Sequence, residues 1–336
     1  MAATISSGLS KEISQRLTTM KPDAILVAEA PTETDEQLLS YYGNGNEFNS
    51  CFHFMFQGLL VNHVKYGARD INFFKEMYGV QRRLPMDNGT GVTDSIFLSN
   101  HDSFAGARAA TQLDGNTDKI KAAGSLYLLL SGIPVVYYGE EIGMQNGPGD
   151  GDEPLRGKIN WNEYDRQKTD QNSVLVHYRK LINLRNAYPA LKNGISYFVH
   201  SGYKYQAAQP TPGQCAWDSN QLEGGSPITS VIRVSGGQKI LVVHNTASNE
   251  AGKNNNGWTY VYVDLSSSSG LNIPFGTNIT PLKYYSSQDP KTFPAVDKDN
   301  QAAYGVGWFG PLQTKIFFIG NDLPTNYVTY DNVLSK

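Results

Sequence analysis

Cysteine is scarce in this chain of 336 residues: Cys51 and Cys215 are its only two, and they form no C-x-x-C pair. Neither a disulfide framework nor a zinc site is therefore indicated, and we interpret both residues as small hydrophobes. Long apolar runs are missing too, since no stretch approaches the roughly 18 residues of a membrane span. The first residues show no basic segment followed by an apolar run, so we expect no secretory signal in this chain, and its localisation stays unassigned.

Neither sign of charge is in excess, because 28 Lys and Arg stand against 31 Asp and Glu and the net charge is −3. This balance provides no basic field, and we expect neither nucleic acid nor membrane as a partner. Charged residues are only 18% of the chain, whereas tyrosine alone supplies 20 residues. Aromatic rings suit sugars, which offer apolar ring faces beside hydroxyl edges. The composition thus favours a neutral polar ligand.

In the first part of the chain, short apolar runs alternate with helical patterns. We expect strands at 24–28, 48–56, 96–102 and 133–141, and helices near 9–17, 57–67, 70–80 (with Asp70 as N-cap), 117–132 and 173–189. Repeated strand–helix units predict a parallel sheet with crossover helices. The unalternating run at 24–28 predicts a strand buried on both faces. In the last helix, one face is formed by Val174, Tyr178, Leu181 and Arg185, and we expect Pro189 to end it.

The pattern changes near residue 195, where helical spacing disappears and alternating runs begin. Residues 230–245 predict a hairpin that turns at Gly236-Gly237, and further strands are expected at 259–265, 281–287 and 314–320. We therefore expect two domains: an α/β domain over 1–194 and an antiparallel β-domain over 195–336.

Polar residues end three of the expected strands, and the carboxyl ends of parallel barrel strands are where active groups gather. The first strand leads to Glu29, the third to His101 and Asp102, and the fourth to Glu140 and Glu141. Two carboxylates at one mouth are the minimum equipment for glycoside hydrolysis, and spacing alone pairs Glu29 with Asp102. A strand must also end somewhere polar, so each residue taken singly has a structural interpretation as well.

Five strings occur here in a recognisable order: ILVAEA, FLSNHD, GIPVVYYGEEIGM, PLRGKINW and YRKLINLRNAYPALKNG. Together they resemble the second half of the α-amylase family, glycoside hydrolase family 13, over roughly residues 8–194. Residues 195–320 are more weakly similar to the C-terminal β-sandwich domain of that family. The resemblance implies strands five to eight of a (β/α)8 barrel followed by an antiparallel β-sandwich. It also implies a retaining glycoside hydrolase that acts on α-glucans or related oligosaccharides.

The resemblance assigns a role to each site residue. Glu29 matches the general acid/base at the end of strand five, and Asp102 matches the transition-state-stabilising carboxylate at the end of strand seven. His101 matches its sugar-binding neighbour, with Asn100 as a further substrate-binding residue, while Glu140 and Glu141 become structural. No metal ligand is assigned. The acidic loop at 147–154 lacks an EF-hand pattern, and calcium is a candidate only for the intact parent enzyme, which we expect to be secreted.

The nucleophile of that family is not found in these residues. It is an aspartate in a G-x-R-x-D string some 25–35 residues before the acid, whereas Asp23 is the first aspartate here and begins the strand that ends at Glu29. The sequence therefore predicts a truncated chain with negligible hydrolysis by itself, because a retaining mechanism needs its nucleophile. Two alternatives stay open. One is a non-catalytic carbohydrate-binding or protein-interaction descendant, and the other is half of a split enzyme whose partner chain supplies strands one to four.

Overall fold

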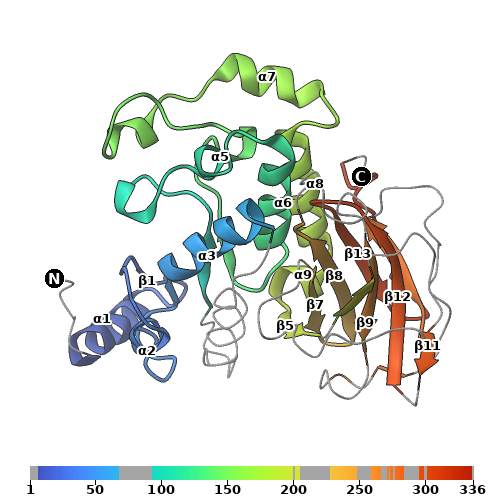
Figure 1. Cartoon of the computed structure of the whole chain (residues 1–336). Coiled ribbons are helices and arrows are strands. Elements are labelled where there is room, and N and C mark those ends of the chain that lie inside the picture. The colour runs from blue at the N-terminus through green and yellow to red at the C-terminus, as the bar shows by residue number, and fades with distance from the viewer. Residues whose placement is uncertain are drawn as a thin grey trace.

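The computed structural model describes residues 7–67, 93–199, 201–204, 228–247, 259–265, 271, 273–274, 277–283, 295–298 and 301–334. The helix expected at 70–80, its cap Asp70 and Cys215 lie outside these residues. Figure 1 shows the N-terminal elements at one end of the molecule and the C-terminal sheets at the other, with α6 and α8 between them.

Four short strands of the first part run parallel to one another. They are β1 (Val27–Ala28), β2 (Ser50–Cys51), β3 (Ser95–Phe97) and β4 (Ile133–Val135). β1 pairs with β2 and β3 with β4, and a parallel bridge from Phe52 to Ser95 joins the two pairs. Because parallel strands point the same way, the segments that follow β1 and β3 leave on the same side of this array.

Three expectations about these strands need correction. The run at 24–28 is not buried on both faces, since Ile25 is 65% and Val27 42% exposed, while Ala28 is buried. β1 pairs with β2 alone among the described strands, so its outer edge remains uncovered there. The strand expected at 48–56 ends at Cys51, because Phe54 already begins α3. The strand expected at 133–141 ends at Val135.

The helices pack mainly around one apolar core. They are α1 (Ser7–Met20), α2 (Asp35–Ser40), α3 (Phe54–Lys65), α5 (Ala109–Gln112), α6 (Thr117–Leu128), α7 (Trp161–Thr169), α8 (Val174–Ala187) and α9 (Pro189–Asn193), with 3-10 turns at Ser103–Ala105, Glu140–Ile142 and Glu153–Arg156. The face predicted for α8 is confirmed, as all four of its residues are buried. Pro189 ends α8 as expected but also opens α9, a position that suits its fixed φ. No helix in the described ranges combines the length and apolarity that a membrane crossing needs.

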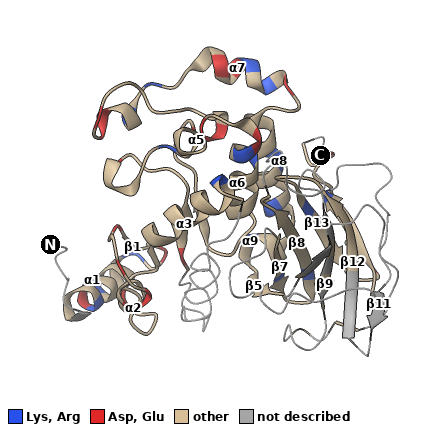
Figure 2. Ribbon diagram, viewed as in Figure 1, with Lys and Arg blue, Asp and Glu red and all other residues tan. Residues whose placement is uncertain are grey.

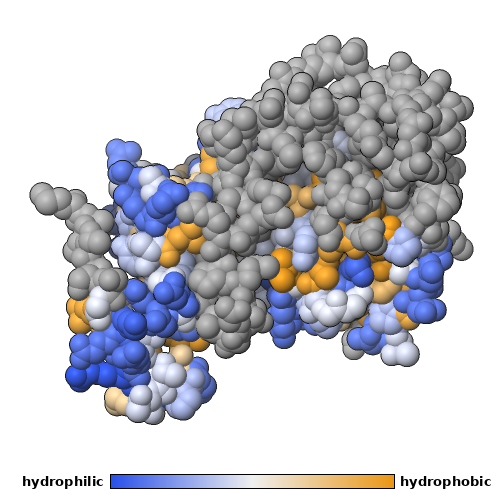
Figure 3. Space-filling view, turned by 90° about the horizontal axis from the view of Figure 1, so that it is seen from below, coloured by the Kyte–Doolittle hydropathy of each residue, from blue (hydrophilic) through white to orange (hydrophobic). Residues whose placement is uncertain are grey.

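The amphipathic helix expected near the N-terminus forms as α1, but part of its apolar side faces solvent. Leu9 is 51%, Ile13 43% and Met20 84% exposed. Figure 3 shows apolar residues among the hydrophilic ones on the N-terminal part of the molecule. Together with Ile25 and Val27, these side chains leave apolar surface next to the outer edge of β1.

The second half consists of strands in two antiparallel sheets. Their bounds are β5 (Ile195–Phe198), β6 (Ser201–Lys204), β7 (Ile228–Ser235), β8 (Gln238–Asn245), β9 (Thr259–Asp264), β10 (Ile279–Lys283), β11 (Ala295–Lys298), β12 (Gln301–Phe309) and β13 (Thr314–Ile319). One sheet has the order β10-β13-β8-β7-β5 and the other β11-β12-β9-β6. The predicted hairpin is confirmed: Ser235 pairs with Gln238, and Gly236 takes the positive φ of 56° that this tight turn requires.

The five-stranded sheet is buried on both faces because its apolar residues alternate. Val231, Ile240 and Val242 pack into the core of α3, α6 and α8, while Ile232 and Leu241 face the four-stranded sheet. The fully buried Arg233 joins the two halves, as its guanidinium donates to the carbonyls of Leu129 and Gly194, each at 2.7 Å.

Candidate active site

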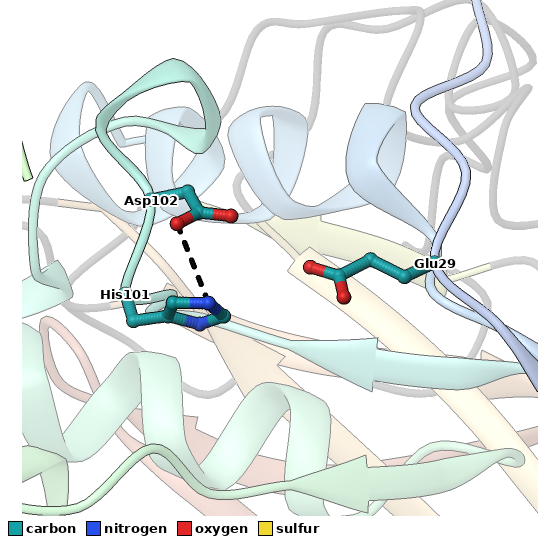
Figure 4. A group of neighbouring side chains, drawn as sticks. All are labelled: Glu29, His101 and Asp102. Atoms are coloured by element: carbon teal, nitrogen blue, oxygen red, sulfur yellow. Dashed lines mark ion pairs between the residues drawn. The ribbon is translucent and has the colours of Figure 1, made fainter. Parts of the chain in front are cut away.

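Two strands that are not paired with each other bring three of the predicted site residues together. Glu29 directly follows β1, and His101 and Asp102 lie on the segment that leaves β3. One ligand atom from each of the three side chains lies within 4.8 Å of the other two. Figure 4 shows the carboxylate of Glu29 pointing toward His101 and Asp102. The structure therefore places side by side the residues that the sequence separates by more than 70 positions.

Asp102 is held by charged neighbours. Its Oδ1 lies 3.3 Å from Nε2 of His101 and accepts a hydrogen bond of 2.7 Å from Nη2 of Arg156. The side chain of Asp102 is 22% exposed, and that of His101 is 47% exposed. A guanidinium bound to one carboxylate oxygen fixes the orientation of the side chain. Oδ2 has no hydrogen-bond or ionic partner among the described residues and is available to a ligand.

Asn100 shapes the turn that presents this pair. It is buried, and its Oδ1 accepts the backbone N–H of Asp102 at 3.0 Å. This is an Asx-type turn, in which the side chain hydrogen-bonds to the backbone two residues later. The geometry gives Asn100 a local positioning contact, and the sugar-binding role expected for it stays a prediction.

Arg156 was not predicted as a site residue. Besides Asp102, it contacts the carbonyl of His101 through Nε at 3.2 Å and Oδ2 of Asp152 through Nη2 at 3.1 Å. Asp152 in turn accepts the backbone N–H of Ser103 at 2.8 Å. That hydrogen bond, with further help from the Ser103 side chain and Arg156, holds the pKa of Asp152 below its usual value. The string PLRGKINW contains Arg156, but nothing in its spacing connects it with Asp102.

The loop that carries Arg156 is anchored by a second, buried arginine. Arg108 donates to the carbonyl of Leu155 at 3.0 Å and 2.6 Å and to that of Tyr138 at 2.7 Å. Its guanidinium also lies over the rings of Tyr137 and Tyr138, at 4.5 Å and 4.8 Å from their centroids. Arg108 thereby fixes the backbone next to Arg156.

The same three residues could in principle offer ligand atoms to a metal ion. However, the guanidinium of Arg156 already occupies Oδ1 of Asp102 at 2.7 Å and places a positive charge beside the cluster. A cation would have to displace it or accept its repulsion. The cluster fits a sugar bound through hydroxyl groups better than it fits a metal.

Glu140 lies apart from this cluster, in the helical core. It is buried, and its Oε1 accepts hydrogen bonds from Tyr127 at 2.6 Å and Tyr178 at 3.1 Å. Burial raises its pKa to about 7, against hydrogen bonds from Tyr127, Ser99 and Tyr178 that lower it. These contacts support the structural role expected for Glu140.

This burial predicts a pH-dependent stability. The ordinary pKa of a glutamate is 4.5, and that of Glu140 in the native state is about 7. At pH values between the two, the native state binds a proton that the unfolded state has lost. The free energy of unfolding should therefore fall by about 3 kcal/mol as pH rises through this window. Glu140→Gln should remove this contribution, because a neutral amide does not titrate. Urea unfolding between pH 4.5 and 7.5 measures the difference between the two proteins.

The exposed Glu33 provides the control, since Glu33→Gln should leave the pH dependence unchanged. Parallel curves for the native sequence and Glu140→Gln would contradict the assignment of a buried, protonated carboxyl to Glu140.

Comparisons with known proteins show which family this chain resembles. Residues 6–168 match the model of the alpha-amylase catalytic domain. The chain is 33% identical over 207 residues to alpha-amylase 3 of Dictyoglomus thermophilum, a match that covers 55% of this chain and 39% of that protein. It is 28% identical over 244 residues to the alpha-amylase SusG of Bacteroides thetaiotaomicron, a match that covers 66% of this chain and 32% of that protein.

Solved structures show the same fold over nearly the whole chain. The alpha-amylase of H. orenii superposes with a TM-score of 0.61 at 22% identity, covering 93% of this chain and 57% of that one. The alpha-amylase of Geobacillus thermoleovorans, complexed with acarbose, superposes with a TM-score of 0.64 at 14% identity, covering 95% of this chain and 58% of that one. The resemblance to the α-amylase family is thus confirmed, and the fold is similar to part of the fold of these α-amylases. This chain spans about a third to two fifths of the two curated relatives and somewhat over half of the two solved structures.

Proposed function

We propose that this chain provides the second part of the active site of a retaining glycoside hydrolase that acts on α-glucans. In this proposal, residues 1–194 form strands five to eight of a (β/α)8 barrel, and residues 195–336 form a C-terminal β-sandwich domain. The observation that carries the proposal is the meeting of Glu29, His101 and Asp102, within 4.8 Å, at the ends of β1 and β3. Family-model and sequence similarity to α-amylases support it.

Each side chain takes one chemical role. Glu29 donates a proton to the glycosidic oxygen as the bond breaks, and it later accepts a proton from the water that completes hydrolysis. Asp102 stabilises the positive charge that develops on the sugar ring, with its free oxygen directed to the ligand. His101 hydrogen-bonds to sugar hydroxyls, an interaction that its exposed ring permits.

The pairing with Arg156 favours stabilisation over nucleophilic attack as the role of Asp102. Arg156 lies 2.7 Å from Oδ1 and holds Asp102 in one orientation, which suits a fixed electrostatic partner of the sugar better than a group that must form a bond to it. The nucleophile is then a carboxylate on a segment outside residues 1–336, either on the same polypeptide or on a separate chain. The exposed side chains of Ile25, which lies just before β1, of Val27 on β1 and of Ile133 on β4 provide apolar edges for that segment.

Reducing-sugar release from maltooligosaccharides tests this function. The 336-residue polypeptide alone should give no release above background, because the covalent intermediate cannot form. Co-expression with a segment that supplies the first four barrel strands of an α-amylase should yield a soluble complex that releases reducing sugar. Clear hydrolysis by the 336 residues alone would overturn the assignment of the nucleophile, and a soluble but inactive complex would favour a binding-only protein.

Arg156 should affect the rate of the assembled enzyme more than substrate binding. We expect Arg156→Gln to lower kcat about tenfold, since it removes the charge-assisted hydrogen bond to Asp102, with little change in KM. Arg156→Lys should recover part of the rate, and thermal unfolding should be unaffected. Steady-state kinetics on maltooligosaccharides provides both parameters.

Arg166 is the matched control, as it is an exposed arginine that pairs with Glu163 on α7. Arg166→Gln should leave kcat unchanged. An equal loss in both variants would show that Arg156 acts through general charge and not through Asp102.

A further inference from the structure

A cavity lies where the helices meet the C-terminal sheet, and the residues that line it do not include Glu29, His101 or Asp102. It has a volume of about 450 Å³, within the range of small-molecule pockets. Its wall includes Lys121 of α6, Lys180 of α8 and Lys283 of β10, together with His177 and Tyr330. Figure 2 shows basic segments on α6, on α8 and on neighbouring strands of the sheet.

Two of these lysines are buried against the same aromatic ring. Lys180 is 9% and Lys283 2% exposed, and their Nζ atoms lie 5.1 Å and 4.9 Å from the centroid of Tyr330. Lys283 also donates to the carbonyl of Thr314 at 2.8 Å. Lys180 has neither a hydrogen bond nor an ion pair with any described residue. The stem of Lys180 is buried, whereas its ammonium group opens into the cavity and contacts the Tyr330 ring.

The described residues of the wall include fewer carboxylates than lysines. Lys121 donates to the carbonyl of Asn172 at 3.0 Å and lies 3.5 Å from Asp118, whose side chain is 78% exposed. Asp331 is the second carboxylate of the wall. Among the described residues of the wall, three lysines thus stand against two aspartates.

His177 is held as a neutral hydrogen-bonding group. Its Nδ1 is 2.5 Å from the hydroxyl of Tyr330, and its Nε2 is 2.8 Å from that of Ser125. Burial, and then the charges of Lys283, Lys121 and Lys180, lower its pKa well below the usual value. The imidazole therefore orients Tyr330 without adding charge.

We propose that this cavity binds the phosphate group of a small phosphorylated compound. A phosphate offers oxygens that accept hydrogen bonds from Lys180 and its neighbours and neutralise the charge of these lysines. The amide side chains of Gln171, Asn172 and Gln313 complete the wall and suit the hydroxyl groups of an attached sugar. Inorganic phosphate and a sugar phosphate share this chemistry.

Isothermal titration of the full chain, at constant ionic strength set with chloride, tests the site with inorganic phosphate, glucose 6-phosphate and glucose. Both phosphate compounds should bind, and glucose should not. Lys180→Gln should weaken phosphate binding about tenfold, the loss expected for one charge-assisted hydrogen bond. Tighter binding of glucose 6-phosphate than of phosphate would identify a sugar phosphate as the ligand, and equal binding would identify free phosphate.

Lys192→Gln is the control, because Lys192 is an exposed lysine of α9 that does not line the cavity. Circular dichroism checks the fold of each variant. If Lys180→Gln does not fold, Lys121→Gln replaces it, and this variant should also bind phosphate more weakly. Absence of phosphate binding, binding of glucose as tight as that of its phosphate, or unchanged affinity in the lysine variants would each overturn the proposal.

Discussion

Replacing Glu29 by glutamine in the assembled enzyme should lower kcat on maltooligosaccharides about 10³-fold, the middle of the range for general acid catalysis. Glutamine keeps the size of the side chain, but its amide is not an acid and cannot transfer a proton to the departing oxygen. The substitution should leave folding intact, because Glu29 is exposed and lies in a segment that follows a strand. Steady-state hydrolysis of maltoheptaose measures the effect.

A substrate that needs no protonation separates this role from a general loss of activity. Fluoride departs from α-maltosyl fluoride without protonation. The rate of the first, bond-breaking step should therefore fall far less in the Glu29→Gln enzyme with this substrate than with maltoheptaose. Added azide should accelerate turnover, because it attacks the intermediate without the help of a general base. The exposed Glu33, on the segment after Glu29, is the matched control, and Glu33→Gln should retain the normal rate. Equal losses on both substrates would contradict the acid role of Glu29.

Asp102→Asn should cost about as much, roughly 10³-fold in kcat, because it removes the charge that stabilises the developing cation. In contrast to Glu29→Gln, this loss should be the same for maltoheptaose and α-maltosyl fluoride, since both pass through a charged sugar. The kinetics of the two substrates, measured in parallel, give the comparison. A loss confined to KM would show that Asp102 only binds the ground state.

Much of the arrangement could be predicted from residues alone. The short apolar runs that end at Glu29 and at His101-Asp102 indicate parallel strands, and parallel strands bring their ends together. The turn at Gly236-Gly237 follows from its glycine pair between two alternating runs. The buried face of α8 from Val174 to Arg185 follows from helical periodicity.

Other features depend on contacts between distant residues, and local patterns do not encode them. The apolar run at 24–28 indicates burial, but whether Ile25 is covered depends on which strand lies beside β1. Arg156 contacts Asp102 across 54 positions, from a loop whose Leu155 carbonyl accepts a hydrogen bond from the distant Arg108. Lys180 and Lys283 lie about 100 positions apart and meet only across Tyr330.

The location of the covalent intermediate tests the central claim most directly. A fluorinated maltosyl fluoride that forms a glycosyl-enzyme quickly and releases it slowly should label the assembled enzyme, and peptide mass spectrometry then locates the sugar. We predict the label on a carboxylate of the segment that supplies the first barrel strands, with Glu29 and Asp102 unlabelled. A label on Asp102, or labelling of the 336-residue chain by itself, would contradict this account.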